Sequence, residues 1–159
     1  MTRLRGRAAR GQRVVDAVPQ GHWKISALIA ALDLRGLRCA MVLDGPVNGM
    51  AFQAFIAQVL ALQLRPGDLV VMDNLSSHQG PRVAELIRAA QAEWVYLPPY
   101  SPDFSPIEPA FSQIKQALRS LAARAVDRLW RARQPVLDQI TPRDAAGFFR
   151  HCGYATEIN

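Results

Sequence analysis

A four-residue apolar run, Leu69-Val70-Val71-Met72, constrains the fold of this chain more than any other segment. An unbroken run of this length and composition is typical of a strand at the centre of a sheet that helices cover. Segments with apolar residues at helical spacing come before and after it. Strand and helix therefore alternate, and this alternation predicts an α/β fold with parallel neighbouring strands.

The other elements are predicted from the same periodicity. In chain order they are strands at 24–33 and 37–43, helices at 48–64 and 81–90, a strand at 94–97, helices at 105–122 and 126–140, and a short helix after Thr141. The first two strands are joined by a short Arg35-Gly36 link, which predicts an antiparallel hairpin. The whole pattern predicts a mixed sheet flanked by helices.

The 159 residues, half of them hydrophobic, are enough for one globular domain. We divide the chain into a basic N-terminal segment at 1–21, a core at 22–122 and a C-terminal helical extension of the same domain at 123–159. No apolar stretch is long enough to span a bilayer, and no secretory signal follows the first arginines. Cys39 and Cys152 fit neither a disulfide framework nor a zinc site. We therefore expect a cytoplasmic protein with no membrane partner.

The net charge of +6 is unevenly distributed along the chain. Five arginines precede the first acidic residue, namely Arg3, Arg5, Arg7, Arg10 and Arg13. A second basic cluster comprises Arg119, Arg124, Arg128, Arg131 and Arg133. Basic segments of this kind favour a polyanion such as DNA, because binding releases condensed counterions. A solvated tail and a solvated helix face remain the alternative.

Two acidic residues stand at positions suited to catalysis. Asp73 directly follows the apolar run, and Glu108 opens a helix after a proline-rich loop, with 34 residues between them. A carboxylate at a strand's C-terminal end and another on a later helix are what a divalent-metal site for phosphoryl transfer needs. Two alternatives stay open. Asp73 could start a turn, and Glu108 could bond back to Ser105 as part of a capping box.

Three segments together resemble the DDE transposases. They are Gly67-Asp68-Leu69-Val70-Val71-Met72-Asp73-Asn74 with His78 following, the loop Leu97-Pro98-Pro99-Tyr100-Ser101-Pro102-Asp103-Phe104-Ser105-Pro106-Ile107-Glu108, and Met41-Val42-Leu43-Asp44-Gly45-Pro46-Val47-Asn48-Gly49. The spacing of 34 is similar to that of the bacterial insertion-sequence branch of the mariner superfamily. The likeness runs from about Arg5 to Tyr154.

The resemblance implies an RNase-H-like fold and catalysis with two Mg²⁺ or Mn²⁺ ions. It makes Asp73 the second catalytic and metal-binding acid, and Glu108 the third. The first aspartate of the family ends a central strand that would lie before Arg3. We therefore expect an N-terminally truncated core that lacks its first central strand, and also lacks the helix-turn-helix module that recognises transposon ends.

The implied function is metal-dependent DNA cleavage and strand transfer during transposition of an insertion sequence. The implied partners are transposon ends and target DNA at the nucleoid, a second copy when the protein is complete, and the product of an upstream reading frame. The candidate DNA-binding residues are Lys115, Arg119, His78, Arg3, Arg5 and Arg7. An exposed loop histidine and a solvated lysine are the plain alternatives for His78 and Lys115.

With its first aspartate missing, the chain alone is expected to be inactive. The alternative function is therefore a non-catalytic DNA-binding or assembly fragment, from a decayed gene or a second reading frame.

Overall fold

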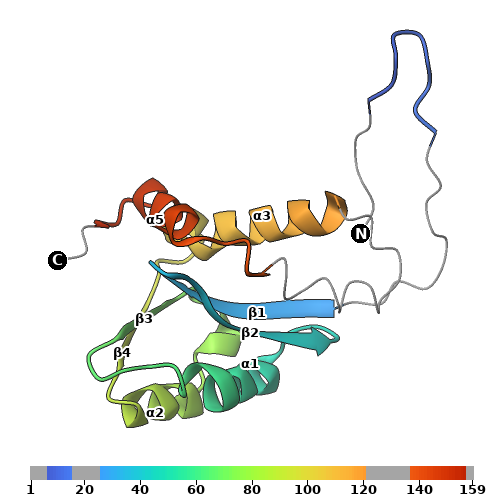
Figure 1. The fold of residues 1–159 in the computed structure, drawn as a ribbon. Coiled ribbons are helices and arrows are strands. Elements are labelled where there is room, and N and C mark those ends of the chain that lie inside the picture. Colours follow the sequence, from blue (N-terminus) through green and yellow to red (C-terminus); the bar gives the residue numbers. More distant parts are fainter. Residues whose placement is uncertain (1–6, 16–25, 121–136, 157–159) are drawn as a thin grey trace.

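The computed structural model describes residues 7–15, 26–120 and 137–156 and has an α/β architecture (Figure 1). Its strands and α-helices are β1 (Ser26–Asp33), β2 (Gly36–Asp44), α1 (Gly49–Phe55), β3 (Leu69–Met72), α2 (Pro81–Ala89), β4 (Glu93–Tyr96), α3 (Ile107–Ser120) and α5 (Pro142–His151). This is the element order that the periodicity predicts. The predicted helix at 126–140 lies mostly outside the described residues, and the division of the chain into three segments stays a prediction.

The antiparallel hairpin of β1 and β2 depends on a tight turn. The Asp33 carboxylate accepts a hydrogen bond from the backbone N–H of Arg35 at 2.7 Å. Gly36 follows with a φ of +113°, and a Cβ at this position would lie 2.6 Å from the carbonyl oxygen of Ile140. Only glycine combines this φ with so close a backbone contact. The turn therefore brings the hairpin against the segment that precedes α5.

A β-bulge interrupts the ladder near this turn. Ala31 pairs with Cys39 and Leu32 pairs with Leu37, so Arg38 is the extra residue. A bulge of this kind redirects a side chain relative to the regular alternation. Here the Arg38 Nε lies 3.2 Å from a carboxylate oxygen of Asp33. The bulge thus adds a second arginine to the hairpin end.

The first helix begins as the sequence predicts and ends earlier. The Asn48 side chain accepts a hydrogen bond from the Ala51 N–H at 2.9 Å, which caps α1. After Phe55 the backbone widens into a π-helical segment, Ile56–Leu60. The predicted end at Leu64 is wrong by four residues, because the N–H of Gln63 turns back to the Leu60 carbonyl. The predicted apolar face is buried, including Phe52, Phe55, Ile56 and Leu60.

The second half of the core is a strand–helix–strand unit. β3 and β4 pair in parallel, from Leu69 opposite Glu93 to Met72 opposite Tyr96. Helix α2 connects them and begins with Pro81, whose ring fixes a φ suited to the first turn. Parallel pairing brings the carboxyl ends of both strands to the same edge. Residues that follow β3 and β4 therefore lie close together.

The predicted mixed sheet is present in two parts. β1–β2 and β3–β4 are separate two-stranded sheets, with no ladder between them in the described part of the chain. The apolar run predicts a covered strand, but the two faces of β3 differ in exposure. Met72 is 8% exposed, whereas Leu69 and Val71 are 58% and 40% exposed. An apolar run shows that a strand is suited to burial, but it does not show whether a neighbour is present.

Two apolar clusters hold the layers together. Helices α1 and α2 lie on one side of the β1–β2 hairpin, and α3 and α5 lie on the other side (Figure 1). The first cluster comprises Ile29, Phe52, Phe55, Ile56, Leu60, Met72, Val83, Ile87 and Ala92. The second comprises Ala110, Ile114, Leu137 and Ile140, with partners on β1 and β2. No helix among the described residues is long and apolar enough to cross a membrane.

Candidate active site

Asp73 stands at the carboxyl end of β3, the first residue after the strand. The Leu97 N–H donates to the Met72 carbonyl at 2.7 Å, which holds the end of β4 beside it. The Asp73 side chain is 50% exposed. This carboxylate therefore lies at the edge where open α/β sheets bind their ligands.

Glu108 lies in the first turn of α3, after a short 3₁₀ turn at Pro102–Phe104. Its backbone N–H donates to the Ser105 carbonyl at 3.1 Å. Its side chain is exposed, and no hydrogen bond or ion pair to its carboxylate is found among the described residues. The Tyr154 hydroxyl donates to the Phe104 carbonyl at 2.8 Å, which ties the loop to the segment after α5. The capping role for Glu108 is thus not formed here, and both of its carboxylate oxygens are available.

Asp73 and Glu108 line the same two cavities. One has a volume of about 310 Å³ and is formed with the proline-rich loop, including Leu97, Pro98 and Ser105. The other, of about 520 Å³, is also lined by Leu28–Asp33 and by Asp68–Met72. We call this larger space the inter-sheet cavity, because residues of β1 and β3 border it. The fold thus brings to one place two carboxylates that are 35 positions apart in the chain.

His78 is fixed beside Asp73 by three contacts. Its Nδ1 is in close contact with a carboxylate oxygen of Asp73, although the approach lacks the alignment of a hydrogen bond. Its ring stacks on Phe52 of α1, with centroids 3.8 Å apart and 23° between the planes. The Tyr96 hydroxyl donates to its backbone carbonyl at 3.1 Å. The plain alternative of an exposed loop histidine is wrong, because the side chain is only 15% exposed.

The other candidate residues are more dispersed. Lys115 and Arg119 lie on α3, two and three turns beyond Glu108, and Lys115 is exposed. Arg7 is exposed in the described segment 7–15. Arg3 and Arg5 lie outside the described residues, as do Arg124, Arg128, Arg131 and Arg133 of the second basic cluster.

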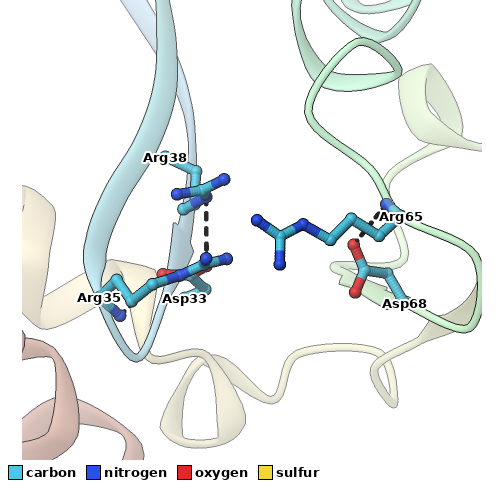
Figure 2. A network of polar contacts seen from close by, with 5 residues as sticks. All are labelled: Asp33, Arg35, Arg38, Arg65 and Asp68. Carbon is cyan, nitrogen blue, oxygen red and sulfur yellow. Dashed lines mark hydrogen bonds and ion pairs between the residues drawn. The ribbon is translucent and has the colours of Figure 1, made fainter.

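A group of charged residues at the hairpin end was not singled out from the sequence. Arg35 and Arg38 both contact Asp33, at 2.7 and 3.2 Å. Figure 2 shows the Arg65 side chain extending toward them from the loop before β3, where its backbone N–H donates to Asp68 at 2.8 Å. The hydrogen bond and the charge of Asp33 raise the pKa of Arg35. We call Arg35, Arg38 and Arg65 the arginine cluster. No local signal predicts it, because Arg65 comes near the hairpin end only through the tertiary fold.

Solved structures of the Mos1 transposase have a similar fold. A Mos1 strand transfer complex aligns with a TM-score of 0.71 at 19% identity, covering 95% of this chain and 46% of that one. A Mos1 mariner paired end complex with Mn aligns with a TM-score of 0.59 at 17% identity, covering 92% and 46%. The Mos1 catalytic domain with raltegravir and Mg aligns with a TM-score of 0.57 at 18% identity, covering 84% and 78%. This likeness identifies an RNase-H-like α/β domain, as the sequence predicts.

The family follows from the sequence itself. Residues 1–129 match the model of the DDE superfamily endonucleases, and the chain belongs to that family. The predicted family and enzyme class are therefore confirmed. The chain spans about half the length of the first two Mos1 structures. No curated protein sequence matches it. The bacterial insertion-sequence branch and the truncation stay predictions.

Proposed function

We propose that the chain is part of a transposase catalytic core in which Asp73 and Glu108 bind divalent metal ions for phosphoryl transfer on DNA. The observation that carries the proposal is that both carboxylates line the same two cavities at the carboxyl edge of β3. Family membership supports the reaction class. The Mos1 structures with Mg and with Mn support the choice of metal.

The donor set suits a hard cation. Carboxylate oxygens are the ligands that Mg²⁺ and Mn²⁺ prefer, and the Glu108 carboxylate has no competing partner among the described residues. In the complete site, two bound ions would supply Lewis acidity toward the phosphate and lower the pKa of an attacking water or 3′-hydroxyl. Asp73 supplies negative charge at the end of a strand, and Glu108 supplies it at the start of a helix. Both side chains are exposed, which leaves them accessible to DNA.

His78 and the cations of α3 have separate proposed roles. His78 orients the Asp73 carboxylate, because its ring is fixed against Phe52 and faces that carboxylate. A direct phosphate contact by His78 has less support, since its side chain is 15% exposed. Lys115 is exposed on the helix that carries Glu108 and is placed to contact a DNA phosphate. Arg119 extends this line by one turn.

The proposed substrates are the ends of an insertion sequence and its target DNA. Mos1 structures described as a strand transfer complex and a paired end complex support this substrate class. We propose further that the complete protein works as a homodimer at the nucleoid in the cytoplasm. An upstream reading-frame product, if present, would belong to the same assembly.

A second candidate function is a non-catalytic DNA-binding or assembly fragment. One observation favours it. The described residues contain no group of three His, Cys, Asp or Glu side chains that could hold a metal ion. Two carboxylates give less negative charge and fewer ligands than a two-ion site needs. DNA binding does not require the third acid, so the fragment could still bind.

Mn²⁺ binding and DNA nicking together separate the two candidates. The 159-residue chain is compared with three variants. Asp73→Asn and Glu108→Gln change the two proposed ligands. Asp103→Asn is the control, because Asp103 lies in the loop before Glu108 but does not line either cavity. We expect Mn²⁺ binding to fall in the first two variants only. Mn²⁺ binding that survives the combined Asp73→Asn and Glu108→Gln changes would refute the metal site. Nicking by the unmodified chain would exclude the second candidate, whereas DNA binding without nicking would favour it.

A further inference from the structure

Tyr100 extends from the proline-rich loop into solvent. Its side chain is 103% exposed, more than any other large hydrophobic residue that the structure describes. No hydrogen bond or ring contact holds this side chain within the described part of the protein. A single exposed aromatic residue is common on protein surfaces, so the backbone that presents the ring carries more weight.

The backbone at Tyr100 has a φ of +56°, in the left-handed region that favours glycine. An aromatic residue in this region costs stability, and it persists where the surrounding structure imposes it, often at a ligand site. Hydrogen bonds on both sides impose it here. The Ser101 hydroxyl donates to the Pro99 carbonyl at 3.2 Å. The Ser105 N–H donates to the Pro102 carbonyl at 2.9 Å. The loop therefore fixes the direction in which the tyrosine leaves the backbone before any partner binds.

Tyr100 lines the smaller cavity, of about 310 Å³, and not the inter-sheet cavity. The smaller cavity has an acidic side, formed by Asp73 and Glu108. Its other lining residues are uncharged, among them Leu97 and Pro99, and no described residue that lines it is basic. Its volume is at the lower end of the range of about 300–1,000 Å³ found for ligand pockets. The cavity therefore suits one nucleotide and is too small for a duplex.

We propose that the smaller cavity binds one unpaired nucleotide of DNA, with its base stacked on Tyr100 and its phosphate beside Asp73 and Glu108. A phosphate needs a cation between itself and two carboxylates, so its position rests on the metal ions of the proposed function. The base is uncharged and suits the apolar side of the cavity. Any base offers a flat face to an aromatic ring, so the stacking tolerates different sequences and does not depend on the metal.

Tyr100 is thus a positioning residue. It holds the nucleotide next to the reacting phosphate and takes no part in the reaction. A ring that the loop already fixes loses little freedom on binding, which makes the contact more favourable.

The test measures whether DNA binding depends on the unpaired base. The 159-residue chain is titrated in Mn²⁺ with a short fluorescent duplex that carries one unpaired adenine nucleotide at its centre. A second duplex carries an abasic nucleotide at the same place. The adenine duplex should bind more tightly by about 5- to 150-fold, the effect that alanine substitution gives for one stacked base. Tyr100→Phe should keep this preference because it keeps the ring, and Tyr100→Ala should remove it.

Phe104→Ala is the matched control. Phe104 is half exposed in the same loop but lines neither cavity, so its variant should keep the preference for adenine. Three results would overturn the proposal. They are equal binding of the two duplexes, a preference that survives Tyr100→Ala, and an equal loss of preference in Phe104→Ala. If Tyr100→Ala changes the sedimentation of the chain and not its base preference, Tyr100 contacts a second copy instead of DNA.

Repeating the titrations in EDTA separates this proposal from the metal site. If the two duplexes bind equally while Mn²⁺ still tightens both, the base pocket is wrong and the metal site stands. If the preference depends on Tyr100 but DNA affinity is the same in Mn²⁺ and in EDTA, stacking on Tyr100 is supported and the proposed metal site is contradicted.

Discussion

At the scale of single residues, the orientation of the proposed metal ligand Asp73 depends on the groups around it. Asp73 is half exposed and would have several orientations without a neighbour. His78 restricts it, and Phe52 with Tyr96 restricts His78 in turn. Groups that orient a metal ligand affect metal affinity even though they do not touch the metal. His78 therefore links a buried aromatic residue of α1 to the exposed edge of β3.

Replacing His78 by phenylalanine tests this link. The variant keeps an aromatic ring on Phe52 but removes the nitrogen that faces Asp73. We expect Mn²⁺ affinity to fall by about tenfold or more, as for other residues that orient a metal ligand. The melting temperature should change little, and His78→Ala serves as the comparison that loses the stack as well. If His78→Phe binds Mn²⁺ as tightly as the original chain, the orienting role is wrong.

At the scale of elements, the hairpin and α5 depend on local backbone geometry. Gly36 combines a φ of +113° with a close approach to Ile140. Helix α5 begins with a complete capping box, in which the Thr141 hydroxyl accepts from the Asp144 N–H and the Asp144 carboxylate accepts from the Thr141 N–H. The sequence predicts a short helix after Thr141, and this helix is confirmed.

The Gly36→Ala change should destabilise the chain. Its methyl group would lie 2.6 Å from a backbone oxygen, and its φ would be strained. Strain of this kind costs about 1–3 kcal/mol. Gly147→Ala is the matched control, because a Cβ there meets nothing within 4 Å and lies inside α5. We expect the control to be neutral or more stable by up to about 1 kcal/mol in urea unfolding, since alanine favours helix.

The capping box should also make stability depend on pH. The hydrogen bond from the Thr141 side chain, with that from its backbone, lowers the pKa of Asp144 below the usual value of 3.8. A lowered pKa in the folded state means that this carboxylate stabilises the chain above pH 3.8 and ceases to do so as pH falls through its folded value. The stability difference between the original chain and Asp144→Asn should therefore shrink below about pH 4. A difference independent of pH from 7 to 2.5, measured by urea unfolding, would contradict this.

At the scale of the whole molecule, basic residues and the two proposed catalytic carboxylates are distributed over several layers. Helix α3 carries Glu108 and lies with α5 against one face of the hairpin, while Asp73 follows a strand of the second sheet (Figure 1). The basic residues Lys115 and Arg119 continue along α3. DNA that reaches both acids would therefore pass along this helix.

DNA binding by the whole chain should weaken steeply with salt. The log of the affinity should fall with the log of salt concentration by about 0.9 per phosphate contact. Alanine at both Lys115 and Arg119 should make that slope less steep, by the amount expected for the loss of about two phosphate contacts. Alanine at Arg3, Arg5 and Arg7 should make the slope less steep by the amount expected for the loss of about three phosphate contacts. Fluorescence anisotropy with two unrelated duplexes measures both the slope and the sequence preference. An unchanged slope in the α3 variant would remove these residues from the interface.

The order of strands and helices, the hairpin, the short helix after Thr141 and the family were all predictable from the sequence. Each rests on residues that are close in the chain, such as the apolar run 69–72 and the segment Thr141–Asp144. Local patterns of this kind report the backbone preferences of a few neighbouring residues, and these survive in the fold.

Other features were decided only by tertiary structure. The division of the sheet, the exposure of Leu69 and Val71, and the meeting of Arg65 with the hairpin end all involve segments far apart in the chain. The burial of His78 against Phe52 is of the same kind. The sequence by itself thus determined the elements, and it proposes Asp73 and Glu108 as the two acids. Packing decided their surroundings, because the free energy of burial depends on which surfaces meet and not on the order of residues.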